Sequence, residues 1–178
     1  MKKIELHLHL DGSINIEYAN KLIGADVKDK LIGTNSTSLK NYLEKFDLPG
    51  ELLQSYDNIE EFSYLLGKDL EADDVIYAEV RFCPLFHIKE ISVDRVILAI
   101  LMGFKRVPNV KINLIFCMMR HFTYEENLEI IKLKSLSLYK EYSKIINSNF
   151  LVSFFNKFNF STILISFIAL PPIYCYIL

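Results

Sequence analysis

The chain has 178 residues, the length of one ordinary globular domain and too short for two of average size. Hydrophobic residues make up 51% and charged residues 24%, which excludes an intrinsically disordered chain. The net charge of −2 argues against nucleic acid as the main partner, and a start that turns polar at once argues against a signal peptide.

Three cysteines, Cys83, Cys117 and Cys175, are too few and too scattered for a disulfide scaffold. Their odd number is typical of a reducing compartment, so we expect a cytoplasmic protein. We expect Cys83 and Cys117 to be small buried hydrophobic residues.

Charge divides the chain into two unlike parts. Residues 134–178 hold four lysines and one acidic residue, Glu141, whereas residues 1–133 hold 16 basic and 21 acidic residues. All six glycines lie at or before Gly103. We therefore predict a folded part over 1–133 and an atypical hydrophobic tail over 134–178.

The folded part begins with a strand over 4–10, in which Ile and Leu alternate with Glu5, His7 and His9. Because one face of this strand is wholly apolar, we expect that face to be buried against helices. Gly12 breaks the strand, and Ser13 is the predicted cap of a helix from about residue 14.

Helices and strands then alternate. We predict a short helix over 39–47 that ends at Pro49-Gly50, and a helix opened by a capping box of Asn58 and Glu61. Further predicted elements are a strand over 75–82, a helix capped by Ser92, a strand over 112–118 and a helix opened by Thr123 and Glu126. This β-α-β-α-β-α order predicts an α/β fold with parallel strands, either an open doubly wound sheet or part of a (β/α)8 barrel.

The tail allows three interpretations. Residues 150–170 are long enough for a transmembrane helix, but Asn156, Lys157 and Asn159 make membrane insertion the weaker choice. A buried strand pair lacks the usual turn residues. We favour an irregular, non-native segment, such as translation past a frameshift or an unspliced boundary in AT-rich DNA.

The strongest chemical signal is His7-Leu8-His9-Leu10-Asp11-Gly12. Two residues apart on a strand, His7 and His9 share a face and can both reach one metal ion, and Asp11 continues that face at the carboxyl end. In parallel α/β folds this end of the strands carries the ligand site. The alternative is an amphipathic edge strand with its polar face in water.

Four segments resemble the adenosine deaminase family of metal-dependent amidohydrolases. KIELHLHLDGS over 3–13 is similar to the family's first strand, AEVRFCP over 78–84 to its second, and INLIFCMMRH over 112–121 to its third. YLEKFDLP over 42–49 is similar to the apolar helix near the mouth of the family's substrate pocket. The resemblance covers about residues 2–133 and implies the first three βα units of a (β/α)8 TIM barrel.

The resemblance also implies roles for single residues. His7 and His9 would be the first two zinc ligands, and His9 and Asp11 would contact a purine nucleoside. Glu79 and Arg81 share a face of the second strand, where a structural ion pair is the simpler interpretation. His87 follows Pro84 in a loop and is expected at the surface.

The family's later site residues have no counterpart here. In the family, a third histidine and an aspartate complete one zinc site, a His-x-Gly-Glu glutamate donates a proton, and a further histidine activates the water. This chain has no histidine after His121, which we interpret as a supporting residue, and one acidic residue after Glu129. We therefore expect an incomplete site and an inactive, truncated chain, with no assignable proton donor.

The expected function is that of a zinc-dependent purine nucleoside deaminase, which converts adenosine to inosine and ammonia. Adenine and AMP deaminases stay open as alternatives, and a His-x-His phosphoesterase fits less well because Asp-Gly follows the histidines directly. From a different class, a non-catalytic protein could use its tail to bind a membrane or a partner. The sequence predicts no nucleic-acid partner and leaves the oligomeric state open.

Overall fold

The computed structural model describes residues 1–33, 36–133 and 176–177. The sheet has the order β1-β2-β3-β4, and its first three strands are parallel: β1 (Lys3–His9), β2 (Val75–Phe82) and β3 (Lys111–Met118). The short β4 (Tyr176–Ile177) lies at its edge. The described part is therefore α/β, with the start of a βα repeat as predicted. The three strands match the predicted ranges to within one residue at either end.

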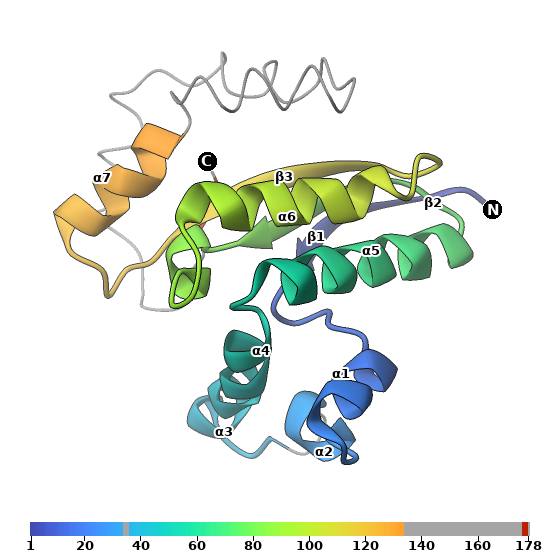
Figure 1. Ribbon diagram of the computed structural model, residues 1–178, viewed down its shortest axis with the longest axis horizontal. Coiled ribbons are helices and arrows are strands. Elements are labelled where there is room, and N and C mark those ends of the chain that lie inside the picture. Colours follow the sequence, from blue (N-terminus) through green and yellow to red (C-terminus); the bar gives the residue numbers. More distant parts are fainter. Residues whose placement is uncertain (34–35, 134–175, 178) are drawn as a thin grey trace.

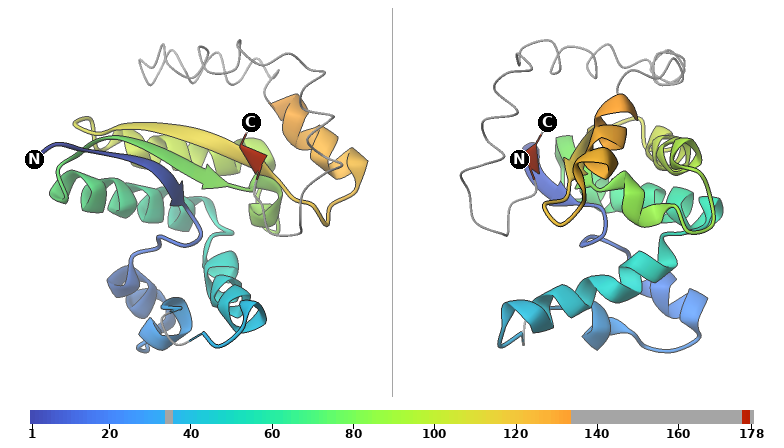
Figure 2. Two further views of the ribbon diagram at one scale, coloured as in Figure 1. Left: turned by 180° about the vertical axis from the view of Figure 1, so that it is seen from behind. Right: turned by 90° about the vertical axis from the view of Figure 1, so that its left-hand side faces the viewer.

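Two long helices cover one face of the sheet, as Figures 1 and 2 show: α5 (Tyr56–Ala72) and α6 (Val93–Lys105). The core lies between the helices and the sheet, where Ala78 and Val80 of β2 and Ile100 of α6 have no exposed surface. Helix α7 (Tyr124–Leu133) follows β3 and completes the third βα unit.

Close packing of α5 against α6 depends on Gly103. A Cβ atom at this position would lie 2.3 Å from the carbonyl oxygen of Glu60 and 2.9 Å from the amide nitrogen of Tyr64. Since both atoms belong to the backbone of α5, the side chain of any other residue would force the helices apart.

Short helices form a lobe beyond the carboxyl end of β1, drawn below the sheet in Figure 1. They are α1 (Ile16–Ile23), α2 (Lys28–Leu31), α3 (Leu39–Leu43), the 3-10 turn η1 (Glu44–Phe46) and α4 (Asp47–Leu52). Another 3-10 turn, η2 (Pro84–His87), follows β2. The lobe thus stands at the end of the sheet where the site residues are predicted.

Three predicted helix boundaries are wrong. The cap of α1 is Asn15, whose Oδ1 accepts from the amide of Tyr18 at 3.0 Å, and not Ser13. The cap of α5 is Ser55, whose hydroxyl accepts from the amide of Asn58 at 3.3 Å, so the Asn58–Glu61 box does not form. At each helix start, both the predicted and the observed residue are of a type that can cap a helix, and tertiary packing selects which of the two does so.

The helical segment also continues through Pro49-Gly50 instead of ending there, because α4 begins at Asp47. Proline in the first turn of a helix removes an amide that has no intrahelical partner. By contrast, Thr123 and Glu126 form the predicted capping box: the Thr123 amide donates to Glu126 Oε2 at 2.7 Å, and the Glu126 amide to Thr123 Oγ1 at 3.2 Å.

The apolar face of the first strand is only partly buried. Leu10 is 1% exposed, but Ile4 and Leu6 are 63% and 54% exposed, so the expectation of a wholly covered face is wrong. Among the described residues β1 pairs only with β2, and the register is irregular between Glu5 and Leu8.

Only two residues of the predicted tail are described. Tyr176–Ile177 form β4, which pairs antiparallel with Met118 and Cys117 of β3. No described helix is long and apolar enough to cross a membrane. The candidate span over 150–170 lies outside the described residues.

Candidate metal and substrate site

His7 and His9 converge at the carboxyl end of β1. Their Nε2 atoms are 3.4 Å apart, and their ring centroids are 5.4 Å apart. Two nitrogens bound to one tetrahedral zinc ion at about 2.0–2.1 Å lie about 3.3–3.4 Å from each other. The separation of the two Nε2 atoms therefore suits two neighbouring ligands of a single ion.

The environment of His9 favours the neutral ring that a metal requires. Burial lowers the pKa of His9, and the nearby ring of His7 and guanidinium of Arg81 lower it further, against an opposite effect of Asp11. Neutral imidazole is the metal-binding form. The strand thus presents its second histidine in a suitable protonation state.

Asp11 lies beside the histidines and contacts His87. Asp11 Oδ1 is 2.9 Å from His87 Nε2, and both atoms are buried without a hydrogen-bond partner of good alignment among the described residues. His87 itself is 1% exposed, so its predicted surface position is wrong. The cause is η2, which turns the chain back beneath Asp11 directly after β2.

A cavity of about 280 Å³ opens between Asp11 and the lobe of short helices. Its lining combines apolar and aromatic side chains with one acid and one base, and polar atoms contribute at least as much of its surface as apolar ones; it is lined by Asp11, Gly12, Ile14, Ile16, Leu31, Ile32, Gly33, Tyr42, Lys45, Phe46 and Pro49. A concave hollow that joins apolar side chains with a few polar groups is typical of a small-molecule site. The 42–49 segment does line this hollow.

Glu79 and Arg81 form the expected ion pair, with Arg81 Nη2 3.7 Å from Glu79 Oε2. Arg81 is 3% exposed and also donates to the carbonyl of Leu6. Tyr77 OH donates to Glu79 Oε1 at 3.1 Å and accepts from Asn113 at 3.0 Å. The network joins β1, β2 and β3 next to the strand segment that carries the histidines.

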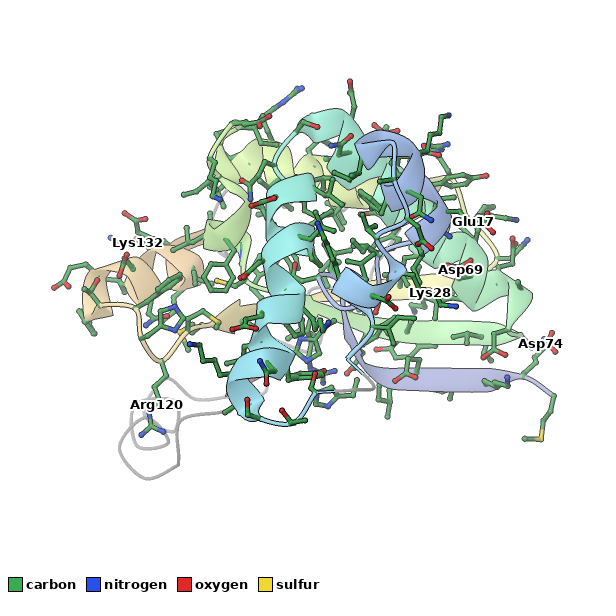
Figure 3. The ribbon with its side chains drawn as sticks, turned by 90° about the horizontal axis from the view of Figure 1, so that it is seen from below. Glu17, Lys28, Asp69, Asp74, Arg120 and Lys132 are labelled. Atoms are coloured by element: carbon green, nitrogen blue, oxygen red, sulfur yellow. The ribbon has the colours of Figure 1, made fainter. Side chains whose placement is uncertain are left out.

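His121 lies apart from the histidine pair, on the loop after β3. It is exposed, and its ring stacks on Phe86 with centroids 5.9 Å apart. The neighbouring Arg120 points outward at one end of the sheet, opposite Asp74 at the other end, as Figure 3 shows. His121 thus contacts no other residue of the described site, and its supporting role stays a prediction.

In the described part of the chain, no group of three or more His, Cys, Asp or Glu side chains could hold a metal ion. The histidine pair is thus two ligands without a third. Cys83 and Cys117 are 3% and 0% exposed, so both are buried as expected. Cys117 is disulfide-bonded, however, so the expectation that it is simply a small hydrophobic residue is wrong. Cys83 is a free thiol, and burial raises its pKa to about 12.

Sequence reasoning missed Gln54 and misplaced His87. Gln54 is 3% exposed, accepts from the amide of Lys89 at 3.0 Å and donates to the carbonyl of Phe86 at 2.9 Å. A lone glutamine between two helices carries no periodic signal. The spacing from Pro84 to His87 gave no sign that the chain turns inward.

A sheet that begins a βα barrel, with paired histidines and an aspartate at its carboxyl end, defines a metal-dependent amidohydrolase-like fold. The adenosine deaminase family model matches residues 2–143. Adenosine deaminase of Clostridium perfringens strain SM101 is 34% identical over 148 residues, covering 74% of this chain and 45% of the relative. The chain belongs to the adenosine deaminase family.

Solved structures agree with this assignment. Arabidopsis ADAL in complex with IMP has a TM-score of 0.63 at 25% identity, covering 75% of this chain and 45% of that one. Arabidopsis N6-mAMP deaminase has a TM-score of 0.63 at 23% identity, with 76% and 46% covered, and shares the fold. The chain therefore spans less than half the length of the relatives it matches.

Proposed function

We propose that residues 1–133 carry the first part of a zinc-dependent adenosine deaminase site, in which adenosine and water give inosine and ammonia. The observation that carries the proposal is the 3.4 Å separation of the His7 and His9 Nε2 atoms, beside a cavity lined by Asp11. Membership of the family supports the reaction type.

The residues present fit zinc as two of its ligands. Both Nε2 atoms face the same point, and the neutral state of His9 supports metal binding. In such a site the ion supplies a bound water of lowered pKa, which is the nucleophile for the purine carbon. His7 and His9 would hold the ion, and the remaining ligands would come from residues outside this pair.

The cavity residues would bind and orient the nucleoside. Asp11 is a hydrogen-bond acceptor for a ribose hydroxyl or a purine N–H, and Phe46 and Tyr42 offer an apolar wall to the ring system. Water would be displaced from this wall on binding. These side chains position the substrate, whereas proton transfer to the ring needs an acid that we assign to no residue of this chain.

We infer that the 178-residue chain does not turn over adenosine by itself. Two imidazoles form a weak site, and no histidine follows His121 in the sequence. Zinc occupancy of the purified chain, measured by elemental analysis, should be well below one ion per chain. Stoichiometric zinc or robust turnover by this chain would contradict the inference.

A nucleotide substrate is the second candidate. It is favoured by the 25% identity to Arabidopsis ADAL, whose structure holds IMP. Lys45 is the one cation that lines the cavity among the described residues, but its ammonium donates to the carbonyl of Asp29 at 2.5 Å. That bond leaves the lysine less available for a phosphate, so we place adenosine ahead of AMP.

The test joins residues 1–133 to the remaining part of the Clostridium perfringens adenosine deaminase. We expect the hybrid to consume adenosine, followed by the loss of its absorbance and the release of ammonia, faster than adenine, AMP or N6-methyl-AMP. His7→Ala and His9→Ala should each reduce turnover by about 100-fold or more.

His121→Ala is the matched control, because this histidine is exposed and lies apart from the pair. It should retain most of the activity. A hybrid that folds and binds zinc but leaves all four substrates unchanged would refute the proposed function. If the hybrid prefers AMP to adenosine, the second candidate, a nucleotide substrate, is the correct one.

A further inference from the structure

His87 is held in one orientation by backbone contacts on the side away from Asp11. Its Nδ1 lies 3.1 Å from the carbonyl oxygen of Leu53, and its ring is 6.2 Å from that of Phe82. A carbonyl oxygen only accepts hydrogen bonds, so Nδ1 is the donor nitrogen in this contact. Nε2 is thereby left facing Asp11.

Gln54 clamps the turn that carries His87. Its amide nitrogen donates to the carbonyls of Phe86 and Gly50, and its oxygen accepts from the amide of Lys89. Gln54 follows α4 and is bonded on both sides of His87, so η2 cannot shift relative to α4 without breaking buried hydrogen bonds. The position of His87 Nε2 is set by this clamp.

His87 and Asp11 meet within hydrogen-bond distance. Nε2 and Oδ1 are 2.9 Å apart, and neither atom has another hydrogen-bond partner among the described residues, although their alignment is not that of a good hydrogen bond. Oδ1 is buried while the Asp11 side chain as a whole is 18% exposed, so this contact leaves the other part of the carboxyl group for the cavity.

We propose that His87 is a positioning residue, which fixes the Asp11 carboxyl group with one oxygen held and the other presented to a nucleoside in the cavity. The role in nucleoside binding rests on the proposed function. The contact itself does not, because it is a property of the chain without substrate. Loss of the His87 contact lets the carboxyl group rotate and weakens binding.

The first experiment uses the full 178-residue chain with 15N-labelled histidine and no added metal. Its four histidines give separable ring-nitrogen signals, and the His87→Gln variant assigns those of His87. In Asp11→Asn we expect the His87 Nε2 signal to move strongly, since an amide N–H then donates to it, while Nδ1 stays unchanged. If the Nε2 signal of His87 does not respond, the contact is absent and the proposal is wrong.

The second experiment measures adenosine binding to three chains: the wild type, His87→Gln and His87→Phe. The glutamine side chain of the first variant can still form a polar contact with Asp11, whereas the phenylalanine ring of the second fills the space without a polar group. We expect His87→Phe to weaken binding about tenfold and His87→Gln to bind within about twofold of the wild type. Thermal unfolding of both variants shows whether they are destabilised alike.

If His87 has only a structural role, adenosine binding should follow thermal stability. Two equally destabilised variants should then bind adenosine equally weakly. That outcome would overturn the proposal. His121→Phe is the control, because it changes an exposed histidine that is stacked on Phe86, and it should leave binding unchanged. If the wild-type chain binds no adenosine, the nitrogen signals alone decide whether His87 holds Asp11, and the hybrid enzyme decides the proposed function.

Discussion

Arg81 is a buried charge that stands next to His9 in the sheet. It is 3% exposed, pairs with Glu79 across 3.7 Å and bonds the carbonyl of Leu6 on the neighbouring strand. A buried guanidinium is costly unless its charge and its N–H groups have partners, and here Nη1 and Nη2 have partners whereas the buried Nε has none among the described residues. The pair therefore stabilises the arrangement of β1 against β2 at the point where the histidines lie.

Glu79→Gln should lower the free energy of unfolding by about 2 kcal/mol, because it leaves the Arg81 charge without a counter-ion in a buried position. Urea denaturation followed by circular dichroism measures this change. The double variant Glu79→Gln/Arg81→Met should be less destabilised than the sum of its single variants. Additive effects would mean that the two side chains do not interact.

Cys83 should be chemically inert in the folded chain. The thiolate is the reactive form, and with burial raising the pKa of this thiol to about 12, only about one molecule in ten thousand carries it at pH 8. Alkylation with iodoacetamide, mapped by mass spectrometry, should label Cys83 in urea but not in buffer. Rapid labelling of the native chain would show that Cys83 is accessible.

Residues of the site differ in how far sequence could predict them. The pairing of His7 with His9 follows from the two-residue period of a strand, and the structure brings their nitrogens together. Their zinc-binding role stays a prediction. His87 could not be placed, because its burial depends on a turn whose direction is set by contacts with Gln54 and Leu53, more than thirty residues away.

Helices and strands were predictable where the pattern is long and packing agrees with it. The strand over 75–82 and the capping box of Thr123 and Glu126 both match the structure, because tertiary packing agrees there with the local sequence pattern. The Asn58–Glu61 box fails because Asn58 instead donates to the carbonyl of Leu52, and Glu61 pairs with Arg106 at 2.7 Å. Short polar motifs lose to tertiary contacts of this kind.

The packing of helix α6 on α5 can be tested at Gly103. Gly103→Ala should destabilise the chain by about 1–3 kcal/mol, because its Cβ would meet the backbone of α5 at 2.3 Å. Gly50→Ala is the matched control within another helix. Nothing lies within 4 Å of a Cβ at Gly50, so this change should be neutral or stabilise by up to about 1 kcal/mol. Thermal unfolding compares them, and equal midpoints would refute the close approach of α5 and α6.

Over the whole molecule, burial is uneven along β1. The strand's end near the cavity is anchored by Leu10 in the core, while Ile4 and Leu6 near its start are exposed. The outer edge of β1 has no partner strand among the described residues. Exposed apolar side chains beside an unpaired strand edge favour association between molecules.

The double variant Ile4→Thr/Leu6→Thr should therefore reduce self-association without lowering stability, since threonine keeps the strand propensity and removes little buried surface. Light scattering over a concentration series measures association, and thermal unfolding measures stability. Leu10→Thr is the contrasting change: it introduces a hydroxyl into the core and should lower the free energy of unfolding by about 2–4 kcal/mol. If the double variant associates as strongly as the wild type, the exposed start of β1 is not the contact surface, and association must come from another part of the chain.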